Sequence, residues 1–189
     1  MKRIAPYQRF LEEQNGKFGF VDGNGHLIIE CIYDEIVEET PTSDNPNERY
    51  FKEGIARVRI NNDWGFINEA GKTIGEIKYK KVNRFGPDYA FVQDEKWQIM
   101  DRHGRIYGEF DFEEVRELSE QIAVVQTKCS SGEFKYGYIH SDGRYLCNTA
   151  FDRAEDFSNG YGVAWVGSKA YYIDRSGYLT EKKPKELYG

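Results

Sequence analysis

Three histidines are the side chains of this sequence best suited to metal binding or proton transfer. His26, His103 and His140 each lie in or beside a predicted hairpin turn, far apart along the chain. None has a second His or Cys at the short spacing that a zinc site needs. The cysteines form an odd set without a CxxC pair, which excludes the common metal and redox spacings: Cys31, Cys129 and Cys147.

Other reactive patterns are also missing. The sequence has no GxSxG, P-loop or GxGxxG motif, and Gly23 and Gly25 around Asn24 lack the alternating acidic ligands of a calcium loop. Adjacent acids such as Glu113-Glu114 point in opposite directions on an extended chain and face water. A catalytic carboxylate pair needs acids from distant segments to face each other. The sequence therefore predicts no enzyme activity, no metal and no cofactor.

Composition narrows the class of protein further. The chain has 189 residues and a formal charge of −6, from 26 Lys and Arg against 32 Asp and Glu. Its basic clusters are short and lie beside acids, which disfavours nucleic acid as a partner. No apolar run is long enough to span a membrane, and the first residues do not resemble a signal peptide. These features predict a soluble, cytoplasmic protein with no membrane association.

A repeated sequence pattern covers most of the chain, so the fold that it encodes must position any functional residues. Four aromatic anchors are each followed by a glycine 7 residues later, an aromatic 15 later and a small or branched apolar residue 18 later. A fifth, incomplete copy begins at Ala170. Self-similarity with a fixed period indicates a solenoid, propeller or stacked array. The four anchors are Phe18, Trp64, Trp97 and Tyr136.

Each copy translates into an antiparallel meander. The anchor strand precedes a turn that opens with Asp or Asn and ends with Gly, as in residues 22–25, and two further strands follow. The expected fold is all-β: tandem three-stranded antiparallel meanders in an open, twisted stack, with a closed propeller-like ring as the alternative. We expect one domain over residues 1–189, with copies near 16–60, 61–94, 95–127, 134–167 and, in part, 168–181.

A glycine follows the anchor in three copies, at Gly19, Gly65 and Gly137. Glycine weakens a strand, so a packing reason is expected. An aromatic ring lying flat on the main chain at this glycine would supply that reason.

This pattern resembles the WG-repeat family. Residues 64–68 (Trp-Gly-Phe-Ile-Asn) with Gly71-Lys72 form the closest copy, and Tyr33-Asp34 ahead of residues 51–56 corresponds to its downstream element. The resemblance covers residues 16 to about 180. It implies an all-β repeat that serves as an interaction or scaffold module, and it implies no catalytic residues.

Two departures from the repeat suggest partner-binding residues. The first copy contains an insertion that includes Asp44 and Asn45; it reads as a surface loop that either contacts a partner or has no role. The middle residue of the third strand should face solvent, yet it is apolar in three copies, as Phe91, Val124 and Trp165. Either these strands are covered on both faces, or they expose an apolar stripe that binds a protein.

The function predicted from these observations is a non-enzymatic β-repeat module that binds another protein. One version is a dedicated inhibitor or immunity-type partner of a basic enzyme, because the chain is small and acidic. The alternative is a carbohydrate- or cell-wall-binding repeat, and a hydrolase built on a propeller is a third reading.

Overall fold

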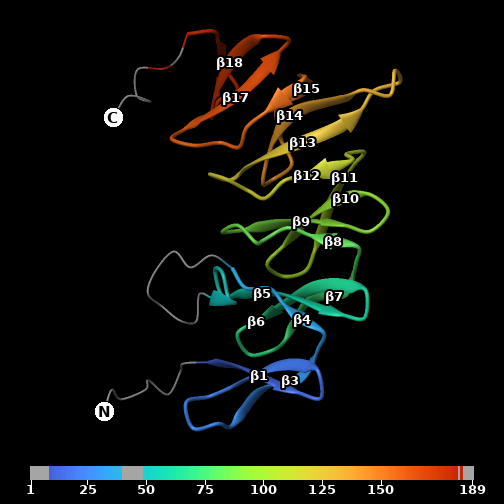
Figure 1. Ribbon diagram of the computed structural model, residues 1–189, viewed down its shortest axis with the longest axis vertical. Helices are drawn as coiled ribbons and strands as arrows, with labels where there is room; N and C mark the ends of the chain where they lie inside the picture. The colour runs from blue at the N-terminus through green and yellow to red at the C-terminus, as the bar shows by residue number, and fades with distance from the viewer. Residues whose placement is uncertain (1–8, 40–48, 183, 185–189) are drawn as a thin grey trace.

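Five antiparallel sheets lie one above another in the computed structural model, which describes residues 9–39, 49–182 and 184. Sheet 1 lies at the bottom of Figure 1 and sheet 5 at the top, and the elements between them follow chain order. The described residues contain no α-helix. The predicted all-β fold and its open, stacked form are confirmed, and the closed ring is excluded because the first and last sheets lie at opposite ends.

Sheet 1 has three strands and each later sheet has four. In sheets 2 to 5 the additional strand has only two residues. The strands, sheet by sheet, are β1 (Phe10–Gln14), β2 (Lys17–Val21) and β3 (Leu27–Tyr33); β4 (Glu35–Ile36), β5 (Ile55–Ile60), β6 (Asp63–Asn68) and β7 (Thr73–Tyr79); β8 (Lys81–Val82), β9 (Tyr89–Gln93), β10 (Trp97–Asp101) and β11 (Ile106–Phe110); β12 (Glu114–Val115), β13 (Ile122–Lys128), β14 (Phe134–His140) and β15 (Tyr145–Phe151); β16 (Arg153–Ala154), β17 (Tyr161–Val166), β18 (Lys169–Asp174) and β19 (Leu179–Thr180).

The short strands carry the chain from one sheet to the next. Strand β3 pairs with β2 up to Tyr33, and one residue later β4 pairs with β5 of sheet 2. The same switch connects β7 to β8 and β15 to β16. A sheet therefore combines the third strand of one sequence copy with the first two strands of the next, so the structural units are offset from the expected copy boundaries.

Asp34 lies at the first switch and joins the two sheets by hydrogen bonds. Its carboxylate accepts a hydrogen bond from Lys17 Nζ of sheet 1 at 2.6 Å and from the Asn61 backbone N–H in the β5–β6 turn at 2.6 Å. The side-chain bond from Lys17, followed by the backbone bond from Asn61, lowers the pKa of Asp34. At the last switch the Asp152 carboxylate accepts the corresponding two hydrogen bonds, from Lys135 Nζ and from the Gly167 backbone N–H.

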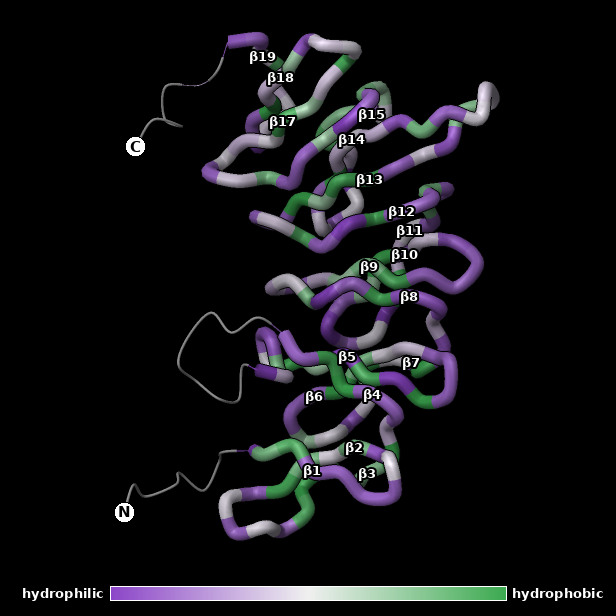
Figure 2. Tube along the Cα trace, in the orientation of Figure 1, coloured by the Kyte–Doolittle hydropathy of each residue, from purple (hydrophilic) through white to green (hydrophobic). Residues whose placement is uncertain are grey.

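Apolar side chains fill each of the four junctions between consecutive sheets. Alternation along a strand sends neighbouring side chains to opposite faces. In β9, Ala90 and Val92 face the core shared with sheet 2, whereas Phe91 faces the core shared with sheet 4. Figure 2 shows hydrophobic stretches on strands such as β9 and β13 and hydrophilic turns along the edges. An interior sheet is therefore covered on both faces.

The glycine after the anchor lies beneath a bulge of the neighbouring strand. Phe18 pairs with Tyr33 and Phe20 with Ile29, so Gly19 alone faces three residues of β3. A Cβ at Gly19 would lie 2.3 Å from the Ile29 carbonyl oxygen. The expectation of an aromatic ring on this glycine was wrong, because backbone of the next strand fills the space. Such bulges let one strand carry extra residues and bend.

In the third copy a bulge also lies opposite the residue after the anchor, but that residue is not a glycine. Gln98 occupies the glycine position, and here Trp97 pairs with Phe110 while Ile99 pairs with Tyr107. Two residues rather than three lie in this bulge, so its backbone leaves room for a side chain. The aromatic paired with the anchor is thus Phe110, and Phe112 stacks on it with a centroid separation of 5.4 Å.

The hairpin turns after the anchor strands follow the expected chemistry. In the third copy Asp101 Oδ1 accepts hydrogen bonds from the backbone N–H of His103 at 2.8 Å and of Arg105 at 3.0 Å. Burial raises the pKa of Asp101, but these bonds and the one from Tyr107 outweigh it and lower the pKa to about 2. Gly104 ends the turn with φ of 81°, as predicted for a residue that reverses the chain.

A second type of turn leads into the third strands and contains a strained residue. Gly54 and Gly160 adopt φ of 76° and 82°, and Gln121 occupies the same place with φ of 66°. A left-handed conformation costs a residue with a side chain about 1–2 kcal/mol. Glycine has no such cost, although it loses more backbone entropy on folding.

Replacing Gln121 with glycine should therefore raise the free energy of unfolding by about 0.5–1 kcal/mol. Chemical denaturation followed by circular dichroism measures the change. The reciprocal variant, Gly160→Gln, should lose a similar amount. A loss of stability in Gln121→Gly would show that the side chain makes a stabilising contact that outweighs the strain.

Candidate functional site

The predicted apolar stripe is interior packing at two of its three positions. Phe91 is fully buried and packs against sheet 4, and Val124 is 2% exposed and packs against sheet 5. The expectation that they form an exposed partner-binding surface was wrong, because a following sheet covers the second face of β9 and β13. The other possibility, strands covered on both faces, is the one observed.

Trp165, the third residue of the stripe, lies on the last sheet and is half-buried. The Arg153 guanidinium stacks over its ring, 4.0 Å from the centroid. No further sheet follows within the described residues. Asp44 and Asn45, also predicted to contact a partner, lie outside the described residues.

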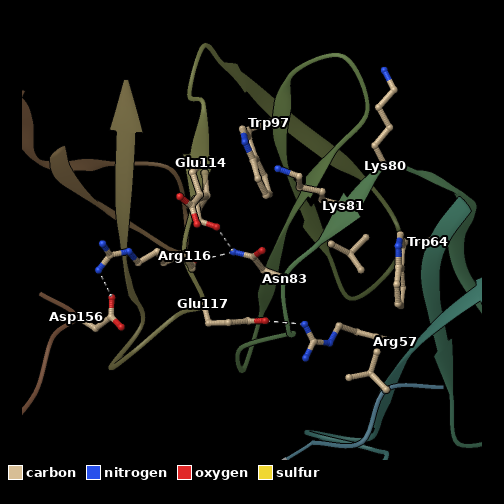
Figure 3. Close-up of a pocket in the computed structure, with 13 residues that line it drawn as sticks. Arg57, Trp64, Lys80, Lys81, Asn83, Trp97, Glu114, Arg116, Glu117 and Asp156 are labelled. Atoms are coloured by element: carbon tan, nitrogen blue, oxygen red, sulfur yellow. Dashed lines mark hydrogen bonds and ion pairs between the residues drawn. The ribbon is translucent and has the colours of Figure 1, made fainter. Parts of the chain in front are cut away.

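A groove of about 570 Å³ lies among the described residues. Its lining comes mainly from sheets 2, 3 and 4 and includes residues of the short strands β8 and β12; Figure 3 shows these residues in close-up. Its lining combines two tryptophans with charged side chains of both signs. The lining residues are Val37, Arg57, Trp64, Lys80, Lys81, Val82, Asn83, Trp97, Glu114, Val115, Arg116, Glu117 and Asp156.

Arg57 forms one wall of the groove and connects two non-adjacent sheets. Its Nε donates to Glu39 Oε1 at 2.7 Å, and its Nη1 donates to Glu117 Oε1 at 2.6 Å. Glu39 is 5% exposed, and pairing with a guanidinium satisfies its buried charge. The other Glu117 oxygen accepts the backbone N–H of Arg84 at 2.7 Å. These contacts fix the lower wall in one position.

Asn83 forms the floor of the groove. It is buried, and its side-chain amide donates to the carbonyl oxygens of Val115 at 2.9 Å and Arg116 at 2.7 Å. Both bonds run from sheet 3 to the short strand of sheet 4 (Figure 3). Arg116 in turn pairs with Asp156 at 3.5 Å. The floor is therefore rigid and hydrogen-bonded before any ligand binds.

Two charges on the upper wall have no partner among the described residues. Lys81 and Glu114 are exposed and lie on either side of Trp97 in Figure 3. The indole N–H of Trp97 is buried and also makes no hydrogen bond to a described residue. Unpaired charges of opposite sign beside a rigid floor are the groups free to bind a polar ligand.

The aromatic rings of the groove offer little open surface. Trp97 is 1% exposed, and the Arg59 guanidinium covers Trp64, 5.6 Å from the ring centroid. A sugar stacks on an open aromatic face; buried Trp97 offers none, and half-buried Trp64 has the Arg59 guanidinium on one of its faces. The tryptophans instead form apolar edges between charged groups.

The sequence did not single out this groove. Lys81 and Glu114 belong to charged clusters that a linear pattern assigns to solvent, and only the stacking of β8 on β12 brings them together. The histidines remain in their turns, where His26 bonds to Asp22 at 3.2 Å. Within the described ranges, no three His, Cys, Asp or Glu side chains are placed to hold a metal ion. Over the same ranges, no helix has the length and apolar character to cross a membrane.

Comparison with known proteins identifies the repeat. No curated protein matches the chain. The family model of the WG containing repeat matches residues 18–39, 64–97 and 136–168. Each match begins at an anchor aromatic and runs through the switch from one sheet to the next, so it covers both the bulge and the short strand. The chain is therefore a WG-repeat protein.

Proposed function

We propose that this WG-repeat protein is a non-enzymatic module that binds another protein through the groove across sheets 2 to 4. The supporting observation is a pair of charges, Lys81 and Glu114, that have no partner in the described part of the chain and lie above a floor that is already hydrogen-bonded. An extended polypeptide segment supplies backbone donors and acceptors and charged side chains of both signs. Such a segment fits a long groove with mixed charge and rigid walls.

A carbohydrate ligand is the second candidate class, and the groove supports it less well. Trp97 is buried, and the Arg59 guanidinium lies on one face of Trp64, so the groove offers few aromatic faces on which a sugar could stack. The dedicated inhibitor of a basic enzyme is a narrower form of protein binding. The net charge of −6 supports it, whereas the lining itself carries four basic and three acidic side chains. Capture that weakens steeply with salt would favour the inhibitor.

Site-specific photo-crosslinking tests the proposal. A photoreactive amino acid replaces Lys81 in one protein and Lys72, an exposed turn residue outside the groove, in the other. The proposal predicts that a protein from the source cells crosslinks at position 81 and not at position 72. Equal crosslinking at both positions, or none at position 81, would contradict it.

The charge-reversed variant Lys81→Glu/Glu114→Lys supplies the affinity measurement for the captured protein. Both side chains are exposed and pair with no residue that the structure describes, so the thermal midpoint should not change. Binding should weaken about tenfold or more, the loss that follows when charge pairs at an interface become repulsive. The control pair Lys72→Glu/Asp88→Lys should bind as the unmodified protein does. Retained affinity in the groove variant would place the binding site elsewhere.

A further inference from the structure

The first residue of each short strand is charged, and its sign alternates from sheet to sheet. Each of these residues lies 17 positions after an anchor aromatic, as Glu35 follows Phe18, so the four positions are equivalent in successive sheets. Two are acidic and two are basic. In chain order they are Glu35, Lys81, Glu114 and Arg153.

The first and last of these four charges are compensated within their own sheets. Glu35 pairs across the sheet with Arg59, whose Nη2 donates to Glu35 Oε2 at 2.9 Å. Arg153 pairs with Trp165, and its guanidinium lies 4.0 Å from the centroid of that ring. In sheets 2 and 5 the cross-strand neighbour therefore satisfies the charge.

The two charges between them have neutral cross-strand neighbours. Lys81 pairs with Gln93 in sheet 3, and Glu114 pairs with Gln126 in sheet 4. Lys81 and Glu114 are exposed, have no partner within the described ranges and both line the groove (Figure 3). The groove therefore presents one positive and one negative charge at equivalent positions of adjacent sheets, and no described residue neutralises either.

The stacking of the sheets sets the separation of these two positions. Sheets that pack face to face lie about 10 Å apart. A polypeptide segment along the groove must present its own two charges at that separation on one face. In a polyproline II segment, residues i and i+3 share a face and lie about 9 Å apart. In a β-strand, residues on one face lie about 7 or 13 Å apart, and neither value matches.

An α-helix also reaches this separation, because residues i and i+7 lie about 10 Å apart on one face. A helix binds by laying an apolar face into a hydrophobic groove, whereas this lining carries four basic and three acidic side chains. Polyproline II segments bind in grooves that aromatic side chains line, and Trp64 and Trp97 line this one from adjacent sheets. The lining thus favours polyproline II over a helix.

We propose that the groove binds a proline-rich segment in the polyproline II conformation, with an acidic and a basic residue three positions apart. The acidic side chain pairs with Lys81, and the basic side chain pairs with Glu114. This inference rests on the proposed function and specifies the conformation and the charge spacing of the bound segment.

Fluorescence anisotropy with labelled synthetic peptides tests this inference, at low ionic strength because salt screens exposed charges. The probe is a proline-based peptide with glutamate and lysine three positions apart. One control places the same two residues four positions apart in the proline host, and the other is an alanine-based helical peptide with a spacing of seven. The probe should bind about fivefold or more tighter than either control, as expected for two exposed charge pairs.

The single reversal Lys81→Glu should change which peptide the groove prefers. The variant has an acidic residue at both positions, so it should bind a proline-based peptide with two lysines three positions apart more tightly than the original probe. Lys72→Glu, which changes an exposed turn residue outside the groove, should keep the preference of the unmodified protein.

Equal binding of all peptides, tightest binding of the helical peptide or an unchanged preference in Lys81→Glu would overturn the inference. A cellular protein that crosslinks at position 81 while the probe does not bind would also overturn it, and would leave the proposed function standing. Absence of both crosslinking and peptide binding would contradict both.

Discussion

Phe91→Ala should lower the free energy of unfolding by about 3–5 kcal/mol, the range for truncating a buried phenylalanine. The ring is fully buried and belongs to the core between sheets 3 and 4 together with Trp97 and Ile139. The adjacent hydrogen bonds from Asn83 to sheet 4 limit how far that junction can close around the cavity. Urea unfolding followed by circular dichroism and by tryptophan fluorescence measures the loss.

Trp165→Ala is the matched control, because Trp165 holds the same place in its strand but has no following sheet. Its loss of stability should be clearly smaller than that of Phe91→Ala, even though the side chain removed is larger. Phe91→Ala should cost more stability because the next sheet buries Phe91, whereas no following sheet among the described residues buries Trp165. A loss for Trp165→Ala equal to or greater than that for Phe91→Ala would contradict the interior placement of Phe91.

Gly65→Ala should destabilise the protein by about 1–3 kcal/mol, the usual cost of forcing extra atoms into a packed site. The new Cβ would lie 2.8 Å from Ile77 Cα and 3.1 Å from the Glu76 carbonyl oxygen. Both belong to the backbone of the bulge, which cannot rotate away as a side chain can. The free energy of unfolding of the purified variant measures the effect.

Gln98 supplies the control for this glycine. It occupies the same position in the third copy, above the smaller bulge, and it is half-buried. Gln98→Ala should change stability by no more than about 0.5 kcal/mol, as for most substitutions at partly exposed sites. Should Gly65→Ala prove as stable as the unmodified protein, backbone contact would not be the reason for glycine at this position.

The sequence predicted the sheets because their determinants are local. The alternation around Trp64, and the Asp and Gly of each turn, act within one hairpin and are visible in one copy. The number of sheets and the open stack follow from repeating that hairpin. The sequence left two interpretations open for the third strands: both faces covered, or one apolar face exposed to a partner. An apolar middle residue such as Phe91 fits both, because the sequence does not show whether the next sheet or a partner covers it.

The bulge, the strand switch and the groove could not be read in this way because they are non-local. The glycine at position 65 meets the backbone of Ile77, and pairing alone reveals that contact. The switch at Asp34 makes one continuous segment serve two sheets, which shifts the structural units away from the sequence copies. Lys81 and Trp97 both pair with Gln93 within sheet 3, and Glu114 becomes their neighbour only when sheet 4 stacks on sheet 3.

Distances between spin labels on equivalent turns test the open stack most directly. Labels would be placed on Asn24 and, in separate proteins without the native cysteines, on Ala70, His103, Asp142 or Ser176, at low concentration. Each later position lies on the same turn of a later sheet. The structure predicts that the distance from Asn24 grows at every step to a maximum at Ser176. A distance to Ser176 shorter than that to His103 would mean that the ends approach each other, and it would contradict the open stack.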